Sequence, residues 1–146
     1  MIVAGWSHGG WTVMELLSAG PKANNIGGFR IEAPARVLTP DAVALYYPYC
    51  GLFNSTGRSR WSFKGPLLFV LPGHAEDSTS GECIDEVKRA RGGLDGVDIE
   101  GFPKNTHAFD EEDQIPGSEF TYDPEATKRA LQLFENFVRA QAQRLR

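Results

Sequence analysis

Residues 5–9 read Gly-Trp-Ser-His-Gly, which places a serine in the pattern G-x-S-x-G. An apolar run, Ile2–Ala4, precedes this pattern and a helix-like stretch follows it. A nucleophilic serine requires that context, because it sits on a strained turn and the flanking glycines let the strand and the helix approach closely. The backbone N–H of His8 then lies at a helix N-terminus, where it can face a developing oxyanion. The sequence therefore predicts a nucleophile at Ser7 and an oxyanion donor at His8.

A serine hydroxyl needs a base to remove its proton, and the chain offers three histidines: His8, His74 and His107. His107 follows an expected strand and lies in a polar loop, where the base falls when the chain order is serine, acid, histidine. His8 adjoins the serine and is expected to have a supporting role at most, as an exposed or capping residue. His74 lies in a turn and is expected to be solvated. We therefore interpret His107 as the general base.

The third member of such a triad is a carboxylate that orients the histidine and stabilises its imidazolium form. It should follow the strand that ends at Leu71, where Glu76 and Asp77 are the two candidates. A triad takes one acid, so the other carboxylate is expected to be solvated or to begin the next helix. Residues 110–113 form a further acidic run after His107. Because this run lacks the glycine-punctuated spacing of a cation-binding loop, we expect a solvated loop there.

Short apolar runs alternate with helical patterns along the chain, which predicts an α/β fold with a mostly parallel sheet. The alternation of polar and apolar residues in Val97–Phe102 indicates a strand near a sheet edge. Residues 21–40 and 50–65 are loop-like. The expected strands are Ile2–Ala4, Ala42–Tyr47, Pro66–Leu71 and Val97–Phe102, and the expected helices are Gly9–Ser18, Gly81–Arg91 and a last stretch that is capped by Asp123 and begins at Pro124.

Composition limits the possible partners. The chain has 146 residues, a formal net charge of −4 and a hydrophobic fraction of 41%. A nucleic acid or an anionic membrane would require a basic face, so neither is an expected partner. No apolar run approaches the roughly 20 residues that span a bilayer. No basic, apolar leader of the kind that directs secretion is visible, which favours a cytoplasmic location.

The two cysteines, Cys50 and Cys83, are too few for a disulfide scaffold or a zinc cluster. Cys50 follows one expected strand and Cys83 begins the helix after the next, so adjacent parallel strands would bring them to the same sheet edge. A bridge between them requires Cα atoms within about 7 Å. Without a visible secretion signal, we favour two buried or half-buried thiols over a bridge.

The whole chain resembles the dienelactone hydrolase family of α/β-hydrolases. The matching segments, in family order, are GWSHGGW at 5–11, YYPYCG at 46–51, PLLFVLPGHAEDSTSGEC at 66–83, FPKNTHAFD at 102–110 and YDPEATKRA at 122–130. The resemblance implies a Ser–acid–His hydrolase that acts on small ester or lactone substrates, with no metal and no organic cofactor. Ser7 matches the nucleophile and His107 the base.

The resemblance leaves the acid open and does not carry over the substrate. The family places its acid in a Gly-x-x-Asp pattern, which puts Glu76 in register after Gly73, whereas Asp77 has the more usual side chain; we lean to Glu76 by spacing and keep both. The founding members carry a cysteine nucleophile. Because this chain has Ser7, dienelactone is not an expected substrate.

In the family, about four strands and their helices precede the nucleophile. The resemblance therefore implies that residues 1–146 are the C-terminal portion of a single α/β-hydrolase domain. The loop that donates the second oxyanion N–H is expected upstream, so residues 1–146 alone are expected to be inactive toward esters. The strand at Ile2 is then expected to expose an apolar edge that favours self-association. The alternative function is that of an inactive relative serving as a binding or assembly module.

Overall fold

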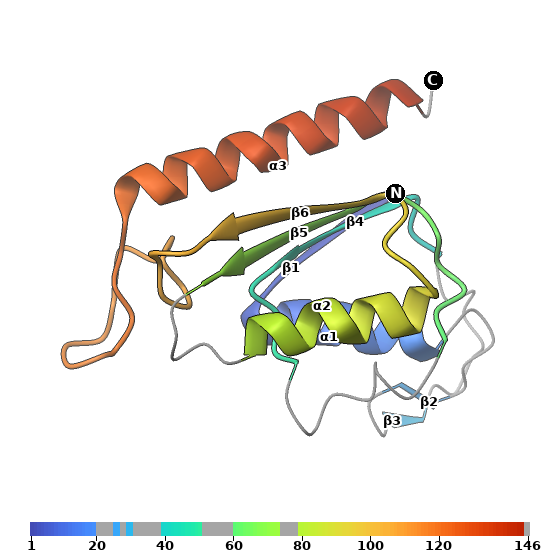
Figure 1. Cartoon of the computed structure of the whole chain (residues 1–146), viewed down its shortest axis with the longest axis horizontal. Helices are drawn as coiled ribbons and strands as arrows, with labels where there is room; N and C mark the ends of the chain where they lie inside the picture. The colour runs from blue at the N-terminus through green and yellow to red at the C-terminus, as the bar shows by residue number, and fades with distance from the viewer. Residues whose placement is uncertain (20–24, 27–28, 31–38, 51–59, 74–78, 145–146) are drawn as a thin grey trace.

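A computed structural model describes residues 1–19, 25–26, 29–30, 39–50, 60–73 and 79–144. It has three layers, as Figure 1 shows. The middle layer is a parallel sheet. Helix α3, Pro124–Arg144, covers one face of the sheet, and helices α1, Ser7–Ala19, and α2, Thr79–Arg91, cover the other. The predicted α/β fold with a parallel sheet is confirmed.

The sheet contains four strands in the order β1-β4-β5-β6, and every neighbouring pair is parallel. Their carboxyl ends therefore lie at one edge of the molecule, where α/β folds place their sites. β6 ends the sheet on one side, as the alternating sequence predicts, and β1 ends it on the other. The strands are β1 Ile2–Trp6, β4 Ala42–Tyr46, β5 Leu67–Pro72 and β6 Val97–Phe102.

Burial follows the sequence pattern of each strand. The sequence of β4 is Ala-Val-Ala-Leu-Tyr, and all of its side chains are buried, as are those of β5. A parallel strand covered on both faces requires such a continuous apolar run. β6 has the sequence Val-Asp-Ile-Glu-Gly-Phe, and of these residues only Phe102 is buried. The central strands therefore supply the core, and β6 forms a charged rim.

Two helix ends have a clear local cause. The Asp123 carboxylate caps α3, because its Oδ1 accepts the N–H groups of Glu125 and Ala126 at 3.0 Å each. The bond from Ala126, followed by one from the Asn105 side chain, lowers the pKa of Asp123. At the end of α2, the N–H of Gly92, with φ 77°, donates to the Lys88 carbonyl at 2.9 Å. None of the helices in the described residues is long and apolar enough to cross a membrane.

Two clusters of buried side chains sandwich the sheet, and we name them after the helices that cover them. The α1/α2 face is largely aliphatic, whereas the α3 face is rich in aromatic rings. The α1/α2 face consists of Val13, Met14, Leu17, Val43, Leu45, Cys50, Trp61, Phe63, Leu67, Phe69, Leu71, Cys83, Val87 and Ala90. The α3 face consists of Ala42, Ala44, Tyr46, Tyr47, Leu68, Val70, Phe102, Phe109, Ala126, Ala130 and Phe137.

The segment predicted as a loop at 21–40 contains regular structure. Strands β2, Asn25–Ile26, and β3, Phe29–Arg30, pair antiparallel. Hydrophobic alternation cannot indicate strands of two residues, because one period of the pattern already spans two positions.

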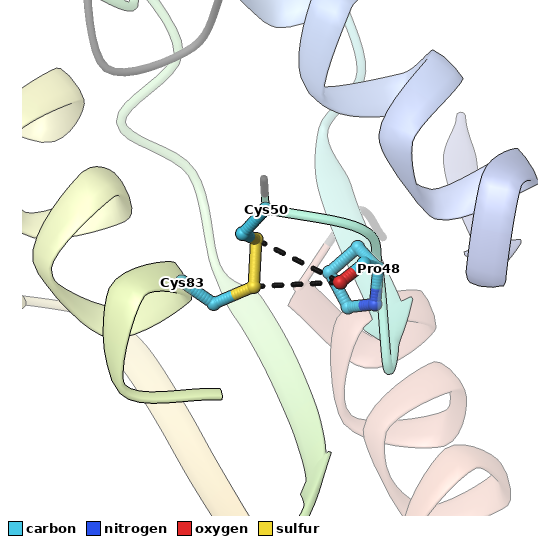
Figure 2. The surroundings of a disulfide bond; sticks show 3 residues. All are labelled: Pro48, Cys50 and Cys83. Carbon is cyan, nitrogen blue, oxygen red and sulfur yellow. Dashed lines mark hydrogen bonds between the residues drawn. A yellow bond between two sulfur atoms is a disulfide. The ribbon is translucent and has the colours of Figure 1, made fainter. Parts of the chain in front are cut away.

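The preference for two free thiols was wrong. Cys50 and Cys83 form a disulfide with Cα atoms 5.1 Å apart, and both side chains are fully buried. Figure 2 shows both sulfur atoms beside the Pro48 carbonyl oxygen; bridged sulfurs carry no proton, so these are contacts without hydrogen bonding. The bridge exists because β4 and β5 are neighbours. Strand adjacency therefore indicated the bridge correctly, whereas the lack of a visible secretion signal did not.

Candidate active site

Ser7 lies on the sharp turn that joins β1 to α1. Its φ is 48°, a conformation that is unusual for a residue with a side chain and costs about 1–3 kcal/mol. The turn depends on glycine at two positions. A methyl group on Gly5 would come within 2.6 Å of the Gly9 carbonyl oxygen, and one on Gly10 within 2.8 Å of the Pro48 side chain.

The role predicted for Gly9 was wrong. A methyl group on Gly9 would meet none of the described atoms within 4 Å, so space does not require glycine there. The close approach is made one residue later, at Gly10, because Pro48 follows the neighbouring strand β4. The turn at Ser7 therefore packs through Gly5 against α1 and through Gly10 against the segment after β4.

The structure brings Ser7 and His107 together across 100 positions of sequence. Ser7 Oγ lies 2.8 Å from His107 Nε2, which is hydrogen-bonding distance for a nucleophile and its base. His8 Nδ1 lies 3.5 Å from the same oxygen, at the limit for a hydrogen bond, and its side chain is exposed. The geometry therefore pairs the serine with His107, as the sequence predicts.

A short irregular segment after β6 holds His107. The next residue, Ala108, has φ 53°, and its carbonyl accepts the N–H of Glu111 at 3.0 Å and Gln114 Nε2 at 2.8 Å. The ring of Phe109 is fully buried and stacks on Phe102 at 4.9 Å. The segment is therefore fixed directly after the histidine by packing of Phe109 and by hydrogen bonds to the Ala108 carbonyl.

The backbone of His8 occupies the position predicted for an oxyanion donor. His8 is the second residue of α1, and the first turn of a helix has N–H groups without a carbonyl partner one turn earlier. The helix dipole adds a positive partial charge there. An oxyanion that forms on a carbonyl attacked by Ser7 would therefore meet the His8 N–H, which the fold has already oriented.

The two acid candidates, Glu76 and Asp77, lie outside the described residues, and so does His74. The segment that leads to them starts beside the segment that leads to His107. The N–H of Gly73 donates to the Phe102 carbonyl at 3.0 Å, and a methyl group on Gly73 would come within 2.6 Å of Pro103. The segment that leads to the acid candidates and the segment that leads to His107 therefore begin side by side, at the ends of β5 and β6.

Asp110 differs from the solvated carboxylate that the sequence predicts. Its Oδ2 accepts Trp6 Nε1–H at 3.2 Å, and its Oδ1 accepts a short hydrogen bond from the Tyr47 hydroxyl. The rest of the acidic run, residues 111–113, is exposed as predicted. Among the described residues, no group of acidic, histidine or cysteine side chains could hold a metal ion. Asp110 follows the buried Phe109, and this position after an apolar residue was the available signal.

Tyr47 is a second residue of the site that sequence reasoning did not single out as functional. It follows β4 with φ 37° and is only 3% exposed. Its ring packs edge-on against the His107 ring, with centroids 4.7 Å apart. Burial, and then the hydrogen bond to Asp110, raises the pKa of the Tyr47 phenol. The hydroxyl therefore stays protonated and donates to the carboxylate.

Other aromatic rings lie next to His107 and His8. Phe120, 44% exposed, lies against His107 with ring centroids 5.3 Å apart. On the α1 side, Trp11 lies 5.5 Å from Tyr49 and 6.2 Å from His8 by the same measure. Aromatic rings therefore lie next to both His107 and His8.

Known proteins add no assignment to this geometry. No family model, no curated protein and no solved structure matches the chain. A function for this chain can therefore be inferred only from the serine, the histidine and the elements that hold them.

Proposed function

We propose that this protein is a serine hydrolase that cleaves carboxylic ester or lactone bonds, with an α/β-hydrolase fold of the dienelactone hydrolase type. The observation that carries the proposal is the 2.8 Å separation of Ser7 Oγ and His107 Nε2, with the serine on a strained turn between strand and helix. The chain order of the motifs, with the serine first and the histidine last, supports the same reading.

The proposed reaction has two steps. His107 Nε2 takes the Ser7 proton while Oγ attacks the carbonyl carbon, and the His8 N–H stabilises the resulting oxyanion. The imidazolium then protonates the leaving alkoxide, which departs as an alcohol, or as the ring-opened hydroxyl of a lactone. Water attacks the acyl-serine in the second step, again with His107 as base, and releases the acid and the free serine.

Glu76 or Asp77 would complete the triad by accepting a hydrogen bond from His107 Nδ1. A carboxylate there holds the imidazole in the required orientation and stabilises its charged form. Glu76→Gln and Asp77→Asn assign the role, because only the variant of the true partner should be severe. Equal and mild effects of both variants would remove both residues from the proposed triad.

Ester turnover by the intact protein that carries these residues tests the proposal. We expect it to hydrolyse p-nitrophenyl acetate or butyrate, or a simple lactone, and Ser7→Ala to lower kcat about 10⁴-fold or more. Ser62→Ala is the matched control, because Ser62 is exposed. Unchanged turnover in Ser7→Ala would overturn the proposal. A folded wild-type protein without turnover would favour the alternative, an inactive relative that serves as a binding module.

A further inference from the structure

The Asp110 carboxylate joins two segments that are far apart in sequence. One of its oxygens accepts the indole N–H of Trp6, the residue before the nucleophile. The other accepts the hydroxyl of Tyr47, which follows β4. Asp110 itself lies three residues after the base, on the same irregular segment. This one side chain therefore links the three segments that meet at the Ser7–His107 pair: the end of β1, the end of β4 and the segment after β6.

Each partner of Asp110 lies in contact with a member of the pair or is its chain neighbour. The Tyr47 ring packs edge-on against the His107 imidazole, with centroids 4.7 Å apart. The Trp6 ring stacks on Tyr46 at 4.9 Å and lies edge-on to Phe134 at 5.8 Å, so the residue before Ser7 is fixed from several sides. Movement of Asp110 would therefore reach the base through Tyr47 and the nucleophile through Trp6.

We propose that Asp110 is a positioning residue, which holds Ser7 and His107 in register by binding Trp6 and Tyr47 at the same time. This inference rests on the proposed function. Both partners are donors, and a carboxylate is a pure acceptor with two oxygens, so the bonding pattern is complementary. Asparagine at this position would present an NH₂ group to one of the donors and so lose one of the two bonds. Misplacement of reacting groups by about 1 Å costs about 10²-fold in rate.

A fluorophosphonate that labels the serine separates positioning from binding and from folding. We expect Asp110→Asn to lower the maximal labelling rate about 10- to 100-fold, while the half-saturating probe concentration and the unfolding midpoint stay close to wild type. Tyr47→Phe removes only the hydroxyl and should give part of the same loss. The double variant should lose less than the product of the single losses, since both break one link. Asp113→Asn, an exposed carboxylate of the same acidic run, is the control.

A second readout needs no substrate. The ¹⁵N shift of His107 Nε2, assigned with His107→Gln, reports its hydrogen bond to Ser7. We expect Asp110→Asn to move this shift toward its value in Ser7→Ala, and Asp113→Asn to leave it unchanged.

The outcomes separate this proposal from the hydrolase proposal. Wild-type labelling at Ser7 with no change in rate or ¹⁵N shift in Asp110→Asn would overturn the positioning role alone. Labelling of wild type at another residue would overturn the hydrolase assignment, while the ¹⁵N shift would still decide whether Asp110 sets the Ser7–His107 hydrogen bond. Equal losses of labelling rate and of folding stability, without a selective change in the ¹⁵N shift, would make Asp110 a structural residue only.

Discussion

The two faces of the sheet differ in the side chains that pack them. The α1/α2 face is an aliphatic core closed by a buried disulfide. The α3 face is richer in aromatic rings, and its rings continue through Tyr47 and Phe109 into the segment that holds His107. Aliphatic packing adapts to many arrangements, whereas stacked and edge-on rings have preferred geometries. The α3 face is therefore suited to fixing orientations, and the α1/α2 face to supplying stability.

Backbone strain gathers around the Ser7–His107 pair. Among the described residues, the non-glycine residues with positive φ are Ser7, Tyr47 and Ala108. All three contact the Ser7–His107 pair, belong to it or adjoin it in the chain. Such conformations persist only where the surroundings impose them, and they cluster at functional sites. Substitutions near the α3 face should therefore affect chemistry, and those on the α1/α2 face should affect folding.

The largest expected effect comes from His107→Gln. Because a neutral imidazole must take the serine proton, we expect ester turnover by the intact protein to fall about 10⁴-fold. Wild-type turnover should rise with pH through about 7, since only the uncharged ring is a base. The exposed His8 provides the control: His8→Gln should keep most of the activity, because the predicted oxyanion donor is its backbone. Near wild-type turnover in His107→Gln would require a different base.

The disulfide gives the next largest effect, on the other face. Replacement of both cysteines by alanine should lower the free energy of unfolding by about 2–4 kcal/mol, because the bridge restricts the unfolded chain. Denaturant unfolding with and without reductant measures this difference, and reductant should change only the wild-type curve. A variant that unfolds like wild type but has lost turnover would place chemistry on the α1/α2 face and break the comparison.

Glu86 on α2 should make stability depend on pH. Burial, partly offset by Arg89 and reinforced by Glu82 and Glu15, raises its pKa to about 7. Its Oε2 is buried and has no hydrogen-bond partner among the described residues. Since the folded pKa lies above the ordinary 4.5, folding favours the protonated carboxyl, and this stability is lost as pH rises through about 7.

Glu86→Gln tests that assignment. The variant should gain about 1 kcal/mol of stability at about pH 8 and show a smaller pH slope above about 5. Asp85→Asn, an exposed neighbour on the same helix that does not contribute to the shift, is the control and should keep the wild-type slope. Urea unfolding across this pH range gives both values. An unchanged slope in Glu86→Gln would contradict the assignment.

The smallest expected effect distinguishes the two edge strands. β1 has the sequence Ile-Val-Ala-Gly-Trp, without charge, whereas β6 carries Asp98 and Glu100. Apolar edges can pair with another chain, and charges oppose such pairing. We therefore propose weak self-association through β1, which Ile2→Lys should reduce severalfold. Ile99→Lys on β6 is the matched control, and sedimentation equilibrium is the measurement. Equal effects of both variants would contradict an edge-specific contact.

Sequence reasoning located the elements because their causes are local. Local sequence is enough to predict the continuous apolar runs of β4 and β5 and the cap at Asp123. The Ser7–His107 pairing was also accessible, because parallel strands place their ends together. The pattern G-x-S-x-G, however, suggested Gly9 where packing requires Gly10, since the crowding atom belongs to the distant Pro48.

The hydrogen bonds of Asp110 could not be predicted from the sequence in the same way. Its partners lie 104 and 63 positions away, and the one local signal, the position of Asp110 after Phe109, does not identify them. The sequence favoured free thiols, because no secretion signal is visible, although strand adjacency pointed to the disulfide. Local patterns therefore predicted which residues could react, and long-range contacts decided which residues hold them.

The most direct test of the central claim is to map where a fluorophosphonate reacts with this chain. After proteolysis, mass spectrometry should find the phosphonyl group on the peptide that contains Ser7. Ser7→Ala should abolish this labelling, and His107→Gln should slow it by orders of magnitude at unchanged folding, because the base 2.8 Å from Oγ is missing. Labelling at another residue, or at Ser7 with a rate that does not depend on His107, would contradict the assignment of this pair as nucleophile and base.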